Sequence, residues 1–170
     1  MLDVLQRNSS EADMRAQDTI RILNRLIQVC RDGEALCRVC ARRKVGAELQ
    51  ALLRTRRDEW GRLGDELQAL VLLLNGEPAK GGTVAASALR AALVLRTSLG
   101  SSVQGAVLDA WQRMQVEALE RYSEAMSGYL PERIRRTVGL QVDRISDRLQ
   151  QIGTLAPGFT GLARGAPRPV

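Results

Sequence analysis

Apolar residues recur along most of the chain at alternating intervals of three and four, the spacing of one face of an α-helix. Glycine or proline interrupts this spacing at a few places and divides it into segments. In the first segment the arc opposite the apolar rows carries charged residues, among them Asp32, and should face solvent. The pattern predicts four amphipathic helices, over 12–44, 47–75, 102–127 and 131–152.

The lengths of the connections predict how these helices are arranged. Only a few residues join the first helix to the second and the third to the fourth, so each pair should form an antiparallel hairpin. Residues 76–101 lie between the hairpins, and their apolar run TVAASALRAALVLRTSL predicts an additional short helix. We therefore expect an all-α, ferritin-like four-helix bundle over 12–152, with two antiparallel hairpins joined by a long crossover. An N-terminal arm (1–11) and a flexible tail rich in glycine, proline and alanine (153–170) flank it.

Composition changes this picture mainly by exclusion. The chain has 23 arginines, 2 lysines and no histidine, and aromatic residues make up only 3% of it. Without histidine it has no Ser-His-Asp triad, no histidine-containing di-iron motif and none of the usual catalytic zinc sites. Nineteen acidic residues are interspersed with the basic ones, so a net charge of +6 predicts a mixed, solvated surface. No aromatic residues interleave with the basic groups, and we expect no nucleic-acid partner.

The sequence also bears on where the protein is located and on the state of its thiols. The sequence has neither a signal-peptide pattern nor an apolar run long enough to span a bilayer, so we expect a cytoplasmic protein without membrane contact. Three cysteines, two of them in CRVC, predict free thiols in a reducing compartment. Three thiols without histidine leave a four-ligand zinc site incomplete, which favours small buried hydrophobes as their role.

Polar side chains on the apolar faces are the candidate site residues. Glu34 and Arg56 lie at similar distances on either side of the first turn, so an antiparallel hairpin places them at one level. Opposite buried charges at one level predict an ion pair, and Glu59, one turn beyond Arg56, is a second partner. Glu34, Arg56 and Gln115 then form a polar core layer that fixes the register of the helices.

A metal centre is the alternative interpretation of these polar residues. Carboxylates replace imidazole in this version, and the ligands are Glu34, Glu59, Glu117 and Asp143. Iron or manganese is the cofactor that such a carboxylate site implies. An arginine at the centre would repel a cation, which favours the polar layer.

Two short stretches carry a family resemblance, LNRLIQVCRDGE in the first helix and GEP after the second. With AWQRMQVEALERYSEAMSGYLPERIRRTVGLQVDRISDRLQQI they resemble an uncharacterised bacterial family of ferritin-like four-helix-bundle proteins, over Ile20 to Ile152. The resemblance implies the fold, since the family has no assigned activity. Ferritin-like relatives often hold two metals between carboxylates and histidines inside the bundle.

The resemblance also implies which metal ligands this chain lacks. Glu34 matches the glutamate of the family's DGE. Gln115 falls where related sequences usually have glutamate, and Ser146 falls where they commonly have histidine before Asp147. Both departures remove ligands, so the resemblance implies a degenerate metal site.

Together these observations predict a non-catalytic interaction protein that associates with itself as a homo-oligomer and needs no cofactor. The alternative is a carboxylate-bridged di-metal oxidoreductase or a metal-storage protein. A third class is an adaptor, because GFTGLARG in the tail combines apolar residues with glycines as short docking peptides for a protein partner often do.

Overall fold

The computed structural model describes residues 2–84, 86–87, 90–91, 93–94 and 102–155 of the chain. None of these residues forms a strand, and they contain four long helices: α1 (Leu2–Ala41), α2 (Ala47–Leu73), α4 (Val103–Ser127) and α5 (Glu132–Leu155). The prediction of an all-α chain with four helices is therefore confirmed.

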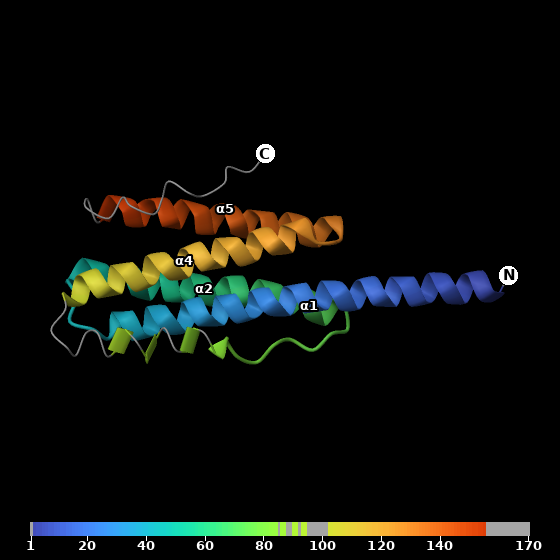
Figure 1. Ribbon diagram of the computed structural model, residues 1–170, viewed down its shortest axis with the longest axis horizontal. Helices are drawn as coiled ribbons and strands as arrows, with labels where there is room; N and C mark the ends of the chain where they lie inside the picture. Colours follow the sequence, from blue (N-terminus) through green and yellow to red (C-terminus); the bar gives the residue numbers. More distant parts are fainter. Residues whose placement is uncertain (1, 85, 88–89, 92, 95–101, 156–170) are drawn as a thin grey trace.

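The helices form two hairpins that lie against each other (Figure 1). α1 packs against α2 along most of their common length, α4 packs against α5, and α1 also packs against α4. Figure 1 shows that the helices of each hairpin run in opposite directions, whereas α2 and α4 run in the same direction. The segment between α2 and α4 therefore has to return along the bundle.

The bounds of α2, α4 and α5 differ from the predicted ones by at most three residues, but α1 begins at Leu2 rather than near residue 12. Most of the predicted arm is thus helical in its backbone. Residues 2–11 contain no glycine or proline, and extending an existing helix avoids the cost of nucleation. At the other end, residues 153–155 continue α5, and the rest of the predicted tail lies outside the described residues.

Side-chain hydrogen bonds explain where α4 begins and ends. The Ser102 hydroxyl accepts a hydrogen bond from the backbone N–H of Gly105 and so caps the first turn. At the other end, the Arg135 guanidinium donates to the carbonyl oxygens of Met126 and Gly128 at 2.7 and 2.8 Å. One side chain of α5 thereby satisfies the last carbonyls of α4 and fixes the second hairpin.

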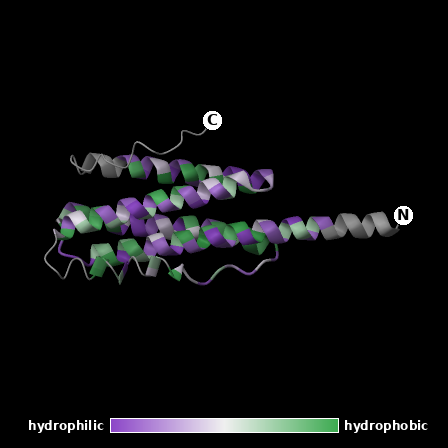
Figure 2. Cartoon of the chain, viewed as in Figure 1, coloured by the Kyte–Doolittle hydropathy of each residue, from purple (hydrophilic) through white to green (hydrophobic). Residues whose placement is uncertain are grey.

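Aliphatic side chains pack around three fully buried aromatic residues, Trp60, Trp111 and Tyr122. Figure 2 shows apolar and polar residues alternating around each helix, as expected for amphipathic helices that share one core. The two helices of the first hairpin approach closely at Gly33, where an added Cβ would lie 2.6 Å from the Trp60 indole. A residue larger than glycine does not fit there without moving the two helices apart.

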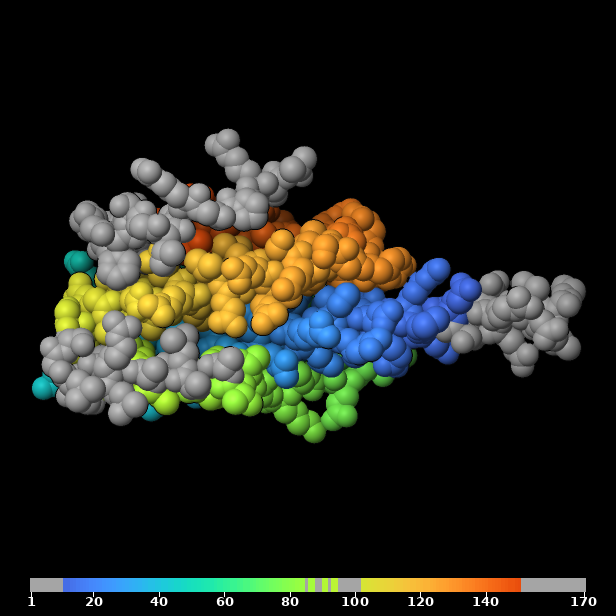
Figure 3. All heavy atoms as spheres, in the orientation of Figure 1, coloured from blue at the N-terminus to red at the C-terminus, as the bar shows by residue number. Residues whose placement is uncertain are grey.

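α1 extends beyond the rest of the bundle (Figures 1 and 3). From residue 11 onward, Thr19 and Ile20 are the first buried residues on this helix, whereas residues 11–15 are exposed. The Arg15 guanidinium lies 5.8 Å from the centre of the Tyr129 ring, at the point where α1 leaves the bundle. We call residues 2–18 the projecting segment.

The connection between α2 and α4 is described in part. Residues 84, 86–87, 90–91 and 93–94 are helical, in the region where the sequence predicts a short helix. The other residues of that prediction, 85, 88–89, 92 and 95–101, lie outside the described part of the chain. Across the described residues, none of the helices combines the length and apolar character that a membrane span requires.

Candidate functional site

Asn24 of α1 holds the loop that follows α2. Its side-chain amide donates to the carbonyl oxygen of Glu77 at 3.0 Å and its side-chain oxygen accepts from the N–H of Ala79 at 2.8 Å. The two ends of one amide therefore fix both sides of Pro78. Asn24 belongs to LNR and Glu77 belongs to GEP, so the two most specific stretches of the sequence contact each other.

Two turns further along α1, Asp32 holds the next part of the connection. Its carboxylate accepts hydrogen bonds from the backbone N–H of Thr83 at 3.0 Å and from the Thr83 hydroxyl at 2.8 Å. The Arg90 guanidinium lies 3.4 Å away. Asp32 is only 7% exposed, so the prediction that it faces solvent is wrong. The connection between α2 and α4 covers its side chain, through Thr83, which lies fifty-one residues further along the chain.

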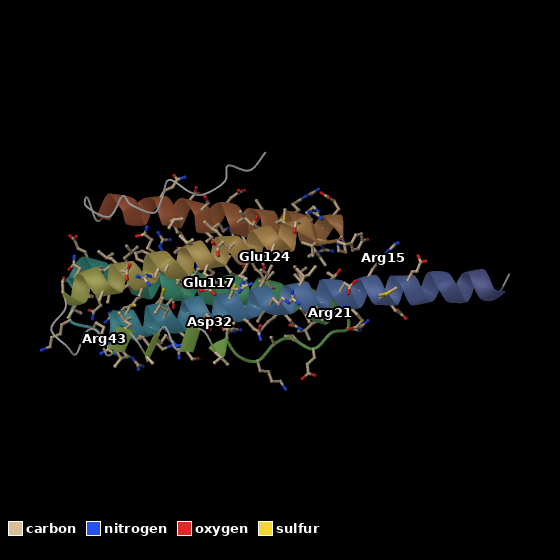
Figure 4. All side chains as sticks on the ribbon, in the orientation of Figure 1. Arg15, Arg21, Asp32, Arg43, Glu117 and Glu124 are labelled. Atoms are coloured by element: carbon tan, nitrogen blue, oxygen red, sulfur yellow. The ribbon has the colours of Figure 1, made fainter. Side chains whose placement is uncertain are left out.

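A cleft of about 270 Å³ opens between α1, α4 and this connection. Val29, Leu36 and Met114 give it an apolar floor. Figure 4 shows Asp32 on α1 and Glu117 on α4, and both line the cleft. Its rim also carries three arginines: Arg25, Arg90 and Arg121.

A buried hydrogen-bond network joins all four helices at one level. The Cys30 sulfur of α1 lies 3.3 Å from the Tyr122 hydroxyl of α4. That hydroxyl donates to the side-chain oxygen of Gln141 on α5 at 2.7 Å. The Gln141 amide nitrogen donates to α2, to the Leu63 carbonyl at 3.3 Å and the Glu66 carboxylate at 2.9 Å. Since the single proton of the tyrosine goes to Gln141, the thiol donates to the phenol oxygen. We call these contacts the four-helix network.

Burial raises the pKa of the three thiols above the ordinary value. It raises the pKa of Cys30 from the ordinary value of 9.0 to about 12, although the hydrogen bond with Tyr122 opposes the rise. Burial also raises the pKa of Cys40 to about 12. The pKa of Cys37 rises further, again because of burial, and the neighbouring Cys40 adds to the effect. All three cysteines are free and buried, so their reactive thiolate form is suppressed.

A second polar cluster lies between α2 and α5, around Glu59. One oxygen of this carboxylate lies 2.6 Å from the Arg56 guanidinium and 3.1 Å from that of Arg148. Arg148 is 6% exposed and lies 5.7 Å from the centre of the Trp60 ring. Burial lowers the pKa of Arg148, and the charge of Glu59 opposes this fall. One carboxylate oxygen is thus shared by two largely buried cations.

Glu34 does not form the predicted pair with Arg56. Its carboxylate binds Arg31 and Arg38 of its own helix, at 3.2 and 3.3 Å, and its side chain is 25% exposed. Arg31 in turn reaches Asp65 on α2 at 3.1 Å. Helical rotation places Glu34 near the apolar rows of α1, but the side chain lies at the edge of that face. There it pairs with two arginines of its own helix instead of Arg56.

The remaining site residues do not gather around one point. Glu117 and Asp143 are exposed on different helices. Gln115 is fully buried, but neither polar atom of its amide has a hydrogen-bond partner among the described residues. The described residues contain no group of three or more histidine, cysteine, aspartate or glutamate side chains that could hold a metal ion. The predicted metal ligands also do not fit a two-metal site, because one oxygen of Glu59 already pairs with two guanidinium groups, whose charges repel a cation.

Arg148 and Gln141 are not among the site residues predicted from the sequence. Gln141 lies three residues after Val138 and four before Ile145, so it belongs to the apolar row of α5. Arg148 continues the same row three residues later. The spacing was therefore sufficient to place both side chains in the bundle, but it could not identify their partners on the other helices.

These features define an all-helical protein with two antiparallel hairpins, a clamped connection and a buried polar network. The chain belongs to the family described as domain of unknown function DUF2383, whose model matches residues 18–128. The match includes α2, α4 and their connection, and it ends before α5 begins. The predicted membership of an uncharacterised family is thus confirmed over this range. No curated protein matches the chain.

Proposed function

We propose that this protein is a ferritin-like helical bundle that works by associating with a second copy of itself rather than by catalysis. The projecting segment is the observation that carries the proposal. At about 1.5 Å per residue, residues 2–18 extend roughly 25 Å, and residues 11–15 remain exposed in the single chain. Met14, on this segment, is 58% exposed.

The direction of the helices supports the ferritin-like part of the proposal. Each hairpin is antiparallel, while α2 and α4 run the same way (Figure 1). Asn24 contacts Ala79 and Asp32 contacts Arg90, so the described part of the connection runs along α1 in the direction of α1. This is the return path that a ferritin-like bundle requires.

Hydrophobic spacing and charge favour a second copy as the partner of the projecting segment. The row that includes Leu23 and Leu26 inside the bundle continues outward at the same intervals to Leu2, and its members are Thr19, Ala16, Ala12, Ser9, Leu5 and Leu2. The segment carries four acidic and two basic residues, whereas the whole chain has a net charge of +6. A net charge of −2 here leaves +8 on the rest, so another copy offers both an apolar seam and opposite charge.

Sedimentation velocity on the full chain and on a variant that begins at Met14 tests this proposal. We expect the full chain to form a dimer or a larger oligomer and the shortened chain to be monomeric. Circular dichroism should show that the shortened chain keeps its remaining helices. A full chain that stays monomeric, or a shortened chain that associates equally well, would refute the proposal.

Point variants distinguish association through the projecting segment from association through any exposed apolar residue. Ala12→Glu should weaken association, because it places a charge in the apolar row of the projecting segment. Leu140→Glu is the matched control, since Leu140 is 54% exposed but lies on α5. It should associate as the wild type does.

Metal analysis of tag-free protein tests the non-catalytic part. We expect no stoichiometric iron or manganese. Two such ions retained per chain would instead favour a di-metal oxidoreductase or a metal-storage protein.

A further inference from the structure

A second cleft, of about 490 Å³, opens between α2 and α5 beside the cluster around Glu59. We propose that it binds the phosphate group of a small polar molecule. Four arginines, three acidic residues and one leucine line it: Arg56, Arg62, Arg144, Arg148, Glu59, Glu66, Asp147 and Leu63.

The arginines of this cleft have donor groups to spare. Arg148 is 6% exposed, and one of its terminal nitrogens has no hydrogen-bond partner among the described residues. The Arg62 side chain forms no ion pair or hydrogen bond with any other described residue, although it lines the same cleft. Arg144 reaches Glu66 through one terminal nitrogen, at 3.4 Å. Arginine side chains from both helices therefore line one space.

Three of the six carboxylate oxygens that line the cleft already have a donor in the described part of the chain. Both arginines nearest to Glu59 share one of its oxygens. The Glu66 oxygens accept hydrogen bonds from Gln141 and Arg144. Asp147 is the one acidic residue of the lining without an ion pair in the described part of the chain. The cleft thus combines a net positive charge with unsatisfied donors, and an anion with several acceptor oxygens would complete it.

Phosphate fits this donor set, because its several oxygens can accept from more than one guanidinium. The planar fork of a guanidinium donates two parallel hydrogen bonds to adjacent phosphate oxygens, and two or more arginines can bind one phosphate at once. The volume of the cleft exceeds that of a phosphate ion and lies within the ordinary range of ligand pockets. Its polar lining favours a hydrophilic group attached to the phosphate.

This inference is independent of self-association, because none of the cleft residues belongs to the projecting segment. Calorimetric titrations at constant ionic strength, with inorganic phosphate, glucose 6-phosphate and glucose as probes, test it. We expect both phosphates to bind with a Kd of about 1 mM or below and glucose not to bind. Tighter binding of glucose 6-phosphate would indicate an organic phosphate, and equal binding would indicate free phosphate.

Two opposite substitutions sharpen the test without touching the buried Arg148. Arg62→Gln should weaken phosphate binding about tenfold, since it removes a charged donor from the cleft. Asp147→Asn should strengthen it, since it removes a repelling carboxylate.

Exposed residues outside the cleft provide matched controls. Arg133→Gln and Glu120→Gln change the net charge by the same amounts, and neither should alter the affinity. The proposal is overturned if neither phosphate binds, or if the controls shift the affinity as much as the cleft variants do.

Discussion

Two glutamates with nearly the same exposure have very different surroundings. The side chain of Glu59 is 24% exposed and that of Glu34 is 25% exposed. The arginines paired with Glu59 are 12% and 7% exposed, whereas those paired with Glu34 are 26% and 49% exposed. The stability that each carboxylate provides should therefore depend on its partners rather than on its own burial.

Replacing each of these glutamates by glutamine measures this difference. Glu59→Gln removes the carboxylate that pairs with Arg56 and Arg148, both largely buried, and should lower the free energy of unfolding by about 2–3 kcal/mol. Glu34→Gln weakens a solvent-facing pair and should cost less than about 1 kcal/mol. Urea denaturation of both variants checks the order. Equal losses would show that the buried arginines do not depend on Glu59.

The hydroxyl of Tyr122 is the central atom of the four-helix network. Tyr122→Phe leaves the Gln141 oxygen buried without its donor, and should lower the free energy of unfolding by about 1–3 kcal/mol. Tyr129→Phe is a matched control, because Tyr129 is 56% exposed and phenylalanine keeps the ring beside Arg15. Chemical denaturation should show almost no change in the control. Similar losses in both variants would contradict the role of the network.

The buried thiols should make stability fall at alkaline pH. In the unfolded chain they ionise near 9.0, whereas in the folded chain Cys30 and Cys40 ionise only near 12. Between these values the unfolded state loses protons that the folded state keeps, so the free energy of unfolding decreases as pH rises; below 9.0 the contribution is constant. Urea midpoints at neutral pH and at about pH 10.5 check this. Cys40→Ala should show a smaller decrease.

The close contact between α1 and α2 depends on Gly33. Gly33→Ala would place a methyl group against the Trp60 indole and should destabilise the protein by about 1–3 kcal/mol, despite the better helix propensity of alanine. Gly61→Ala, in α2, meets no atom within 4 Å and should stabilise it by up to about 1 kcal/mol. Thermal and urea unfolding give the signs. A stabilising Gly33→Ala would mean that the helices can separate at little cost.

Most of this architecture was predictable, because helices and their buried faces follow from local spacing. The positions of α2, α4 and α5 and the burial of Gln115 required only the period of the apolar residues. Pairing was not predictable in the same way. Whether a long side chain such as Glu34 bonds within its helix or across to another depends on rotation and reach. The burial of Asp32 depends on a segment fifty-one residues away.

The family match does not include the whole folded core, because part of that core lies on α5. The match ends at residue 128, whereas Gln141 and Arg148, on α5, complete both polar clusters. A fragment of residues 1–128 should therefore lack a cooperative unfolding transition, since the apolar face of α4 and the Tyr122 hydroxyl lose their partners. Calorimetry checks this. A chain ending at residue 155 is the control and should unfold cooperatively.

The bond between Tyr122 and Gln141 also bears on how such sequences can diverge. A relative that keeps this tyrosine but has a different last helix needs another buried acceptor for the hydroxyl. Without such an acceptor, we expect a residue without a hydroxyl in place of the tyrosine. Substitutions at these two positions should therefore occur together. The residue at position 122, inside the family match, should predict the residue at position 141, outside it.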